Sequence, residues 1–235
     1  MLPYLYRASN FTLYTYPLVW GLASGLAYFY LLQLASSTQT KSNIRSFYWL
    51  VFLAGWAGAK IAYLLFSSGE YFDFYLTSSS FWLGGGYVFW GGPLLAGPIA
   101  YLLELIFPTR YLGITSHLVK PLLLAHGVGR IGCFLAGCCY GIFWGEVQIP
   151  VQLFESLGLF AMLWLFIKGY LGRHDGVAEY LIYYGLWRTI LEFYRADTIR
   201  GHIGENFSYA QVISVIAVVI GSLKLTVKFR QTRPQ

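Results

Sequence analysis

Long apolar runs separated by short polar segments are the main pattern along this chain. A helix that crosses a bilayer needs about 20 mostly apolar residues, and several of the runs reach that length. The pattern predicts an all-α polytopic membrane protein with seven transmembrane helices. Because no connecting segment is long enough for a soluble domain, residues 1–235 are expected to form a single integral membrane domain. We expect the helices at residues 11–34, 47–66, 81–103, 118–136, 151–167, 178–194 and 209–223.

Composition narrows the class of protein further. Hydrophobic residues make up 57% of the chain and charged residues only 11%. A soluble domain carries about 25% charged residues, so an ordinary soluble enzyme is excluded, and so is a disordered chain. Aromatic residues reach 20%, which is typical of spans that end in aromatic belts within a lipid bilayer. The net charge of +6 is scattered between the apolar runs, so no nucleic-acid partner is expected.

The basic residues also predict an orientation. Lys and Arg favour the short loops on the cytoplasmic side of a membrane. With the N-terminus outside and the C-terminus cytoplasmic, ten of the 16 basic residues lie in inside segments. Only Arg7, Arg195 and Arg200 then lie outside. The expected location is a bacterial inner (plasma) membrane, with the functional site facing the periplasm or cell exterior.

Five ionisable residues fall within the expected spans: Lys60, Arg130, Glu155, Arg188 and Glu192. A charge at mid-bilayer costs about 2.5–3.5 kcal/mol on insertion scales, so such residues usually face a protein interior or a wet cavity. The predicted topology places all five in the outer half of the bilayer. They are therefore expected to converge there.

Two interpretations of these residues remain open. Arg188 and Glu192 are i,i+4 neighbours on one helical face, and Glu155 is a partner for Arg130, which favours a structural ion-pair network. However, the set contains three cations and two acids. A lipid phosphate from the outer leaflet would balance the remaining charge, and Arg is well shaped for bidentate phosphate contacts.

The segment from His126 to Gly141 contains five glycines and all three cysteines of the chain. Four hypotheses compete for Cys133, Cys138 and Cys139: inert buried thiols, a disulfide such as Cys133–Cys138, a reactive thiolate beside Arg130, or a metal site with His126. No established ligand spacing is present, so neither a resident metal nor a cofactor is assigned. The glycines permit close backbone approach, either to another helix or to a ligand.

Five motifs, in order along nearly the whole chain, resemble the bacterial prolipoprotein diacylglyceryl transferase family. GAKIAY at 58–63 is similar to the family's G-x-R-x-G-Y, and GRIGCF at 129–134 to its signature G-R-x-G-N-F. PVQLFE at 150–155 is similar to P-S-Q-L-Y-E, and AQVIS at 210–214 to G-Q-x-x-S. Residues 184–197 are similar to Y-G-x-x-R followed by I-E-F-x-R-x-x-D, which ends here at Asp197.

The resemblance implies transfer of a diacylglyceryl group from phosphatidylglycerol to the lipobox cysteine of a preprolipoprotein. It also implies seven helices around a lipid-filled cavity that opens to the outer leaflet. Arg130 and Arg188 match the family's essential arginines, and Cys133 stands at its signature Asn, so these three are the candidate catalytic residues. The candidate substrate-binding residues are Lys60, Trp90, Gly91, Gly92, Gly129, Gly137, Gly141, Gln152, Glu155, Glu192, Arg195 and Gln211.

Several positions depart from the family pattern. Trp90 stands where the family has a His often assigned to thiol activation, and Cys138 replaces a Glu. Only about eight residues separate Gly141 from Pro150, where typical members insert a periplasmic head. Two alternatives follow: a divergent transferase of the same fold with another acceptor, or a non-catalytic phospholipid-binding membrane protein. Close helix packing is the simpler interpretation of Gly91 and Gly92.

Overall fold

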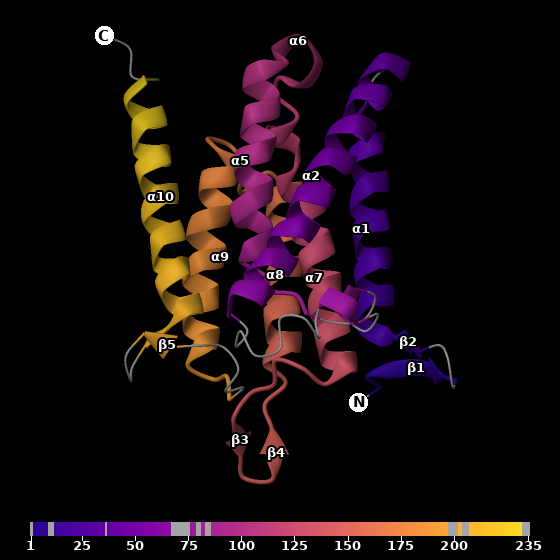
Figure 1. The fold of residues 1–235 in the computed structure, drawn as a ribbon. Coiled ribbons are helices and arrows are strands. Elements are labelled where there is room, and N and C mark those ends of the chain that lie inside the picture. Colours follow the sequence, from indigo (N-terminus) through magenta and orange to yellow (C-terminus); the bar gives the residue numbers. More distant parts are fainter. Residues whose placement is uncertain are drawn as a thin grey trace. The chain divides into compact units, whose positions relative to one another are not determined.

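The computed structural model describes residues 2–8, 12–35, 37–66, 76–78, 81–82, 86–196, 202–203 and 207–231. The chain divides into two compact units. One comprises Tyr4–Leu118, and the other comprises Val119–Gln235 together with Met1–Pro3. Figure 1 shows the helices of the first unit in indigo to magenta and those of the second in salmon to yellow.

The unit Tyr4–Leu118 is built around a small apolar core. Leu31 and Phe47 are fully buried, and both belong to a cluster with Ile44, Tyr111 and Ile114. A short antiparallel hairpin precedes the helices of this unit. Its elements are β1 (Tyr4–Arg7), β2 (Thr12–Tyr14), α1 (Thr15–Gln33), α2 (Thr38–Phe66), α5 (Gly91–Ile106), α6 (Pro108–Tyr111) and the 3-10 turn Thr115–His117.

Glycines let α2 and α5 approach each other closely. A Cβ added to Gly58 would lie 2.3 Å from the carbonyl oxygen of Gly91, and one added to Gly91 would lie 2.3 Å from that of Gly58. A Cβ on the next residue, Gly92, would lie 3.3 Å from the carbonyl oxygen of Gly55, which is about one turn before Gly58 on α2. Since real Cβ atoms do not tolerate the shorter of these distances, Gly91 serves close helix packing here.

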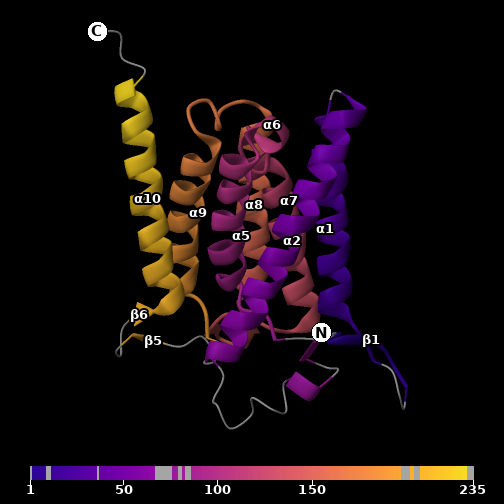
Figure 2. The same cartoon turned by 45° about the horizontal axis from the view of Figure 1, so that its top comes forward.

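In its described residues, the second unit has four helices, α7 (Val119–Ala136), α8 (Val151–Ile167), α9 (Gly176–Glu192) and α10 (Tyr209–Gln231), with one short hairpin between α7 and α8 and another between α9 and α10. Successive helices pack where a small residue faces a large one or a backbone: a Cβ on Gly158 of α8 would lie 2.2 Å from Trp187 Nε1 of α9, and one on Gly185 of α9 would lie 2.8 Å from the Ser214 oxygen of α10. Figure 2 shows α9 and α10 side by side along their length. The first hairpin consists of β3 (Phe143–Trp144) and β4 (Val147–Gln148), and the second of β5 (His202–Ile203) and β6 (Phe207–Ser208).

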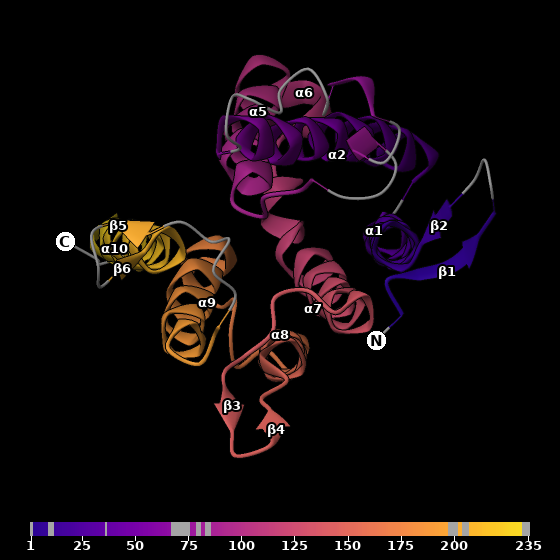
Figure 3. The same ribbon diagram turned by 60° about the horizontal axis from the view of Figure 1, so that its bottom comes forward.

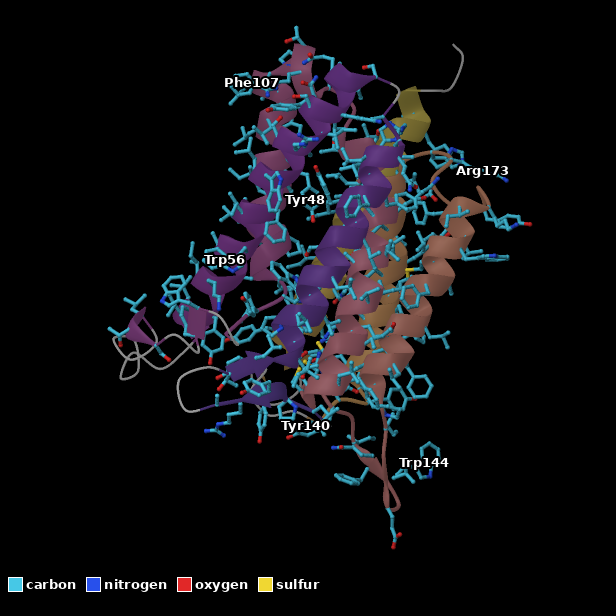
Figure 4. All side chains as sticks on the ribbon, turned by 90° about the vertical axis from the view of Figure 1, so that its right-hand side faces the viewer. Tyr48, Trp56, Phe107, Tyr140, Trp144 and Arg173 are labelled. Atoms are coloured by element: carbon cyan, nitrogen blue, oxygen red, sulfur yellow. The ribbon has the colours of Figure 1, made fainter. Side chains whose placement is uncertain are left out.

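Both hairpins of this unit lie at the same end of its helices. The β3–β4 hairpin joins the end of α7 to the start of α8, and β5–β6 lies between the end of α9 and the start of α10. Figure 3 views the unit from this end. Trp144, 77% exposed, projects from the tip region of β3–β4, whereas Arg173 lies at the opposite end (Figure 4). The connections therefore bring the end of α7, the start of α8 and the end of α9 together.

The helices agree with the expected spans to different degrees. The fourth and fifth expected spans correspond to α7 and α8, the latter with identical bounds. The third was expected to begin at residue 81, and this start is wrong, because α5 begins at Gly91. Gly86 has φ +70, a conformation outside the helical region, and the Val88 N–H donates to the Ala59 oxygen of α2 instead. The hairpins were not anticipated.

Three described helices are long and apolar enough to cross a membrane: Gln39–Leu65, Val119–Ala136 and Tyr209–Arg230. A fourth candidate is Gly91–Ile106 together with Pro108–His117, a pair bent by 112°. Val151–Ile167 is a shorter apolar helix. The described residues thus form a mostly helical structure with three to four candidate membrane spans, and the number seven stays a prediction.

Candidate functional site

Glu155, on the second turn of α8, is the centre of a buried ion-pair network in the second unit. Its side chain is 1% exposed. One carboxylate oxygen, Oε1, lies 2.9 Å from Arg130 Nη2, and the other, Oε2, accepts a hydrogen bond of 3.0 Å from Arg188 Nη1. The predicted pairing of Glu155 with Arg130 is confirmed, and a single carboxylate holds two guanidinium groups.

Helix α9 supplies its part of the site as a stripe with a spacing of four residues. Tyr180, Tyr184, Arg188 and Glu192 are all buried. Residues four apart lie on one face of a helix, one turn above another. The Tyr184 hydroxyl donates to Glu155 Oε1 over 2.8 Å, and Arg188 Nη2 pairs with Glu192 Oε2 at 2.7 Å. The predicted i,i+4 pair is confirmed.

Helix α7 contributes His126 and Arg130, again one turn apart on one buried face. The His126 ring nitrogens lie 3.4 Å from the hydroxyls of Tyr180 and Tyr184, and Nε2 lies 3.9 Å from Glu155 Oε1. The sequence pattern suggested His126 only as a metal ligand and did not point to the two tyrosines. The four-residue spacings to Arg130 and Arg188 are the signal that would have found His126 and Tyr184.

Arg195 also belongs to the cluster, among the residues that the structure describes. Arg195 Nη1 lies 3.9 Å from Glu192 Oε2, which adds a third guanidinium to Arg130 and Arg188. Against these stand the two carboxylates of Glu155 and Glu192. A buried group of three guanidiniums and two carboxylates is suited to an anion, because Arg binds phosphate oxygens bidentately.

The three cysteines lie beside this cluster, at the end of α7 and in the turn that follows. Their sulfur atoms all lie within 4.8 Å of one another, and no disulfide joins them. Cys133 is buried, and its Sγ lies 4.0 Å from Arg130 Nη1. Cys139, beyond the helix, has a pKa well below the ordinary thiol value, because the Cys133 and Cys138 thiols hydrogen-bond to it. All three cysteines are free, so the Cys133–Cys138 disulfide, one of the four hypotheses, is not formed in this structure.

Other predicted residues of this unit have clear structural partners. Gln152 Nε2 donates to the Cys138 oxygen over 2.6 Å, which holds the cysteine turn against α8. A Cβ on Gly141 would lie 2.5 Å from the Ile149 oxygen, and Gly137 has φ +78.

Gln211 is part of the cap that begins α10. Its side-chain oxygen accepts a hydrogen bond from the Ser208 N–H (3.0 Å), and Ser208 Oγ accepts one from the Gln211 N–H (3.2 Å), which is a capping box.

The remaining predicted residues lie in the unit Tyr4–Leu118. The Lys60 ammonium donates to the Phe81 oxygen and lies 3.8 Å from the centre of the Tyr87 ring. Trp90 directly precedes α5, and its ring packs at 5.4 Å against that of Phe89. The structure thus brings Arg130, Glu155, Arg188 and Glu192 together, while Lys60 has its own aromatic surroundings. Asp197 lies outside the described residues.

An apolar groove of about 330 Å³ runs between α8 and α9. Met162, Leu165, Tyr183 and Ile190 contribute to its lining. Trp187 also lines it and directly precedes Arg188 on α9. Hydrocarbon chains fit such a lining, because transfer of apolar surface from water is favourable.

Comparison with known proteins assigns the chain to a family. The family model of prolipoprotein diacylglyceryl transferase matches residues 3–227. A phosphatidylglycerol–prolipoprotein diacylglyceryl transferase of Aeromonas hydrophila is 30% identical over 85% of this chain and 78% of its own, and one of Lactococcus lactis is 30% identical over 80% and 81%. Another, from Clostridium tetani, is 34% identical over 59% of this chain. The matched part covers 63% of that relative, which is less than two thirds of the relative's length. The chain therefore belongs to the prolipoprotein diacylglyceryl transferase family.

Proposed function

We propose that the protein is a phosphatidylglycerol–prolipoprotein diacylglyceryl transferase. The observation that carries the proposal is the pair of guanidiniums, Arg130 and Arg188, held by the buried carboxylate of Glu155. The names of the relatives supply the substrates, and a pair of guanidiniums held side by side fits the phosphate of the lipid donor.

In the proposed reaction, the two arginines act on the phosphate of the lipid donor. The thiol sulfur of the acceptor cysteine attacks the diacylglyceryl carbon that carries the phosphate ester. A C–S bond forms, the C–O bond breaks, and the electron pair leaves with glycerol phosphate, which also takes up the thiol proton. Arg130 and Arg188 orient the phosphate and stabilise the charge that develops on it as the bond breaks. Because Glu155 fixes both guanidiniums before substrate binds, little reorganisation is needed during the reaction.

The groove between α8 and α9 is a suitable place for an acyl chain of the donor. Its lining is apolar, and Trp187 connects it along α9 to Arg188. A lipid whose phosphate lies at the arginines would extend its chains along such a helix pair. The proposal thus accounts for a charged cluster and an apolar groove on neighbouring parts of one helix.

We further infer a bacterial inner-membrane protein with seven spans that form one domain, N-terminus outside and C-terminus cytoplasmic. Support comes from the two ends of the second unit. Lys120, Lys168, Arg173 and Lys228 belong to the ends of helices opposite the hairpins, whereas Arg130 and Glu155 lie toward the hairpin end. Basic residues favour the cytoplasmic side, so the ion-pair cluster faces the periplasm or cell exterior.

A second candidate is a transferase of the same fold with a different acceptor. Trp90 favours it, because an indole cannot take up a proton from a thiol as the family's His would. In a covalent version, Cys133 would carry the diacylglyceryl group transiently. Full activity of Cys133→Ser, Cys138→Ser, Cys139→Ser and the triple variant would eliminate that version.

The test is a reaction with purified protein in phosphatidylglycerol-containing vesicles. A lipobox peptide with its cysteine is compared with the same peptide carrying Ser, and both glycerol phosphate and the lipidated peptide are measured. We expect both products only with the cysteine peptide, and a loss of at least about 100-fold in Arg130→Ala and Arg188→Ala. Glycerol phosphate release without peptide modification would favour the other acceptor. Bound phospholipid with no release would contradict enzymatic function.

A further inference from the structure

The three thiols of the chain are gathered into one cluster by the turn that ends α7. Cys133 is on the last turns of the helix, and Cys138 and Cys139 follow its end. Gly137 at φ +78 and Cys139 at φ +61 both adopt left-handed backbone conformations, which are costly for a residue other than glycine. The Cys138 thiol donates a hydrogen bond of 3.6 Å to the backbone carbonyl oxygen of Cys133, so the turn folds back onto the helix. A strained residue is thus retained where it brings the third sulfur to the other two.

The arrangement of the sulfurs matches what a thiophilic metal ion requires. Zinc–sulfur bonds are about 2.3 Å long, so three sulfurs around one ion lie about 4 Å apart. The three Sγ atoms here lie within 4.8 Å of one another, so adjustments of less than about 1 Å in the side chains would close a three-sulfur site. No backbone rearrangement is needed for that change.

Access and charge also fit an ion. Cys138 is exposed and Cys139 is half-buried, so an ion can enter from the hairpin end of the unit, whereas Cys133 closes the site from inside. Three thiolates around a divalent ion carry one net negative charge. The Arg130 guanidinium, 4.0 Å from Cys133 Sγ, is placed to offset it.

We propose that Cys133, Cys138 and Cys139 form a binding site for a soft, thiophilic d10 metal ion such as Zn²⁺. Binding replaces up to three S–H protons with metal–sulfur bonds and releases those protons to solvent. A disulfide accounts less well for the cluster, because it would use two of the three sulfurs and has no need of a neighbouring cation. The proposal does not depend on transferase activity, although an ion at Cys133 would compete with lipid phosphate for Arg130.

Titration with Cd²⁺ tests the site, because cadmium–thiolate bonds give an ultraviolet charge-transfer band. The full-length protein is kept reduced with a phosphine, in detergent, at neutral pH. Every cysteine of the chain lies in the cluster, so the band has no other source in the protein. We expect saturation at one Cd²⁺ per chain, displacement by Zn²⁺, and weaker binding as the pH falls and the thiols are protonated.

The variants provide the control. We expect the triple variant Cys133→Ser/Cys138→Ser/Cys139→Ser to lose the band, and Cys138→Ser alone, at an exposed position, to weaken Cd²⁺ binding at least about tenfold. Size-exclusion profiles and unfolding temperatures show whether each variant is folded. Absence of the band in folded, reduced protein would overturn the proposal, as would unchanged affinity in a folded Cys138→Ser variant.

Discussion

Glu155 is the residue on which the candidate site depends most directly. One carboxylate oxygen contacts Arg130 of α7 and the other contacts Arg188 of α9. The oxygen that contacts Arg130 also accepts a hydrogen bond from the Tyr184 hydroxyl. The carboxylate is 1% exposed, so its charge is not offset by water. Burying an ion pair costs desolvation of both groups, which the geometry must repay with several good hydrogen bonds, as it does here.

Glu155→Gln tests this role with little change in side-chain shape. The amide can still accept from Tyr184, but it removes the negative charge that lies between Arg130 and Arg188, while Arg188 keeps its pair with Glu192. Removing one partner of a buried pair costs about 3–5 kcal/mol. We expect a clear drop in unfolding temperature in detergent and loss of diacylglyceryl transfer. An unchanged unfolding temperature would contradict the central position of the carboxylate.

At the residue level, the sequence was informative wherever a charge lay in an apolar run. Five residues were predicted to converge for that reason, and four of them, Arg130, Glu155, Arg188 and Glu192, do. The fifth, Lys60, belongs to the other unit, so its approach to them stays a prediction. His126 and Tyr184 carry no formal charge that a bilayer would exclude, so the same argument passed over them. For the three cysteines the sequence left four hypotheses open, because the closeness of all three sulfurs depends on the left-handed turn at Gly137 and Cys139.

At the level of elements, the start of α9 is held by a charged cap. Asp175 accepts from the Ala178 N–H over 2.9 Å, and Lys224 of α10 lies 3.2 Å from the same carboxylate. Burial alone would raise the pKa of Asp175, but the Ala178 hydrogen bond and the two lysines, Lys224 and Lys228, together lower it. The cap therefore joins the ends of two helices as well as starting one.

Asp175→Asn separates the charge from the cap. Asn caps a helix about as well as Asp, so the variant loses only the attraction to the partly exposed lysines, about 0.2–1 kcal/mol. Since the folded-state pKa is lowered, the charge stabilises the fold above the unfolded-state pKa, near 4. We expect the free energy of unfolding of Asp175→Asn to be lower than that of the unmodified protein at neutral pH. This difference should disappear as the pH falls through the folded-state pKa of Asp175. A difference that persists in acid would contradict this assignment.

Two glycines on α7 provide a matched pair. A Cβ on Gly127 would lie 2.7 Å from the Phe160 ring of α8, whereas one on Gly129 would meet no heavy atom of the described residues within 4 Å. Overpacking costs about 1–3 kcal/mol, and replacing an unconstrained helical glycine by alanine gains about 0.5–1 kcal/mol. Gly127→Ala should therefore lower the unfolding temperature, and Gly129→Ala should leave it equal or higher.

Gly129→Ala also tests a predicted substrate contact. If lipid approaches the backbone at Gly129, the variant remains stable but its activity falls. Equal stability losses in the two variants would contradict the packing described for α7 and α8. Full activity of Gly129→Ala would remove Gly129 from the substrate-binding residues.

Helix α8 shows how far apolar patterning reaches, since its bounds coincide with the predicted run. Pro150 directly precedes the helix and ends the extended segment before it, so the start of α8 can be predicted from the sequence. The start of α5 could not be predicted in the same way. Its true beginning at Gly91 depends on the left-handed Gly86 and on a backbone hydrogen bond to α2, a contact between residues distant in sequence.

At the level of the whole molecule, the family to which the chain belongs and the ion-pair cluster on α7, α8 and α9 together support diacylglyceryl transfer. The resemblance was readable because five motifs keep their order, and the family match over residues 3–227 supports it independently of any single motif. The order of the motifs along the chain does not predict that one carboxylate, Glu155, contacts both arginines. The departures at Trp90 and in the short β3–β4 hairpin make the reaction on a lipoprotein the point to test.

Complementation tests this claim most directly. The protein and its Arg130→Ala/Arg188→Ala variant are expressed in bacteria depleted of their own diacylglyceryl transferase, and a reporter preprolipoprotein is followed by gel shift and mass spectrometry. Immunoblotting of membranes shows that both are present at equal levels. The account predicts a diacylglyceryl adduct on the lipobox cysteine with the intact protein and none with the double variant. No adduct from well-expressed intact protein, or an equal adduct from both, would contradict it.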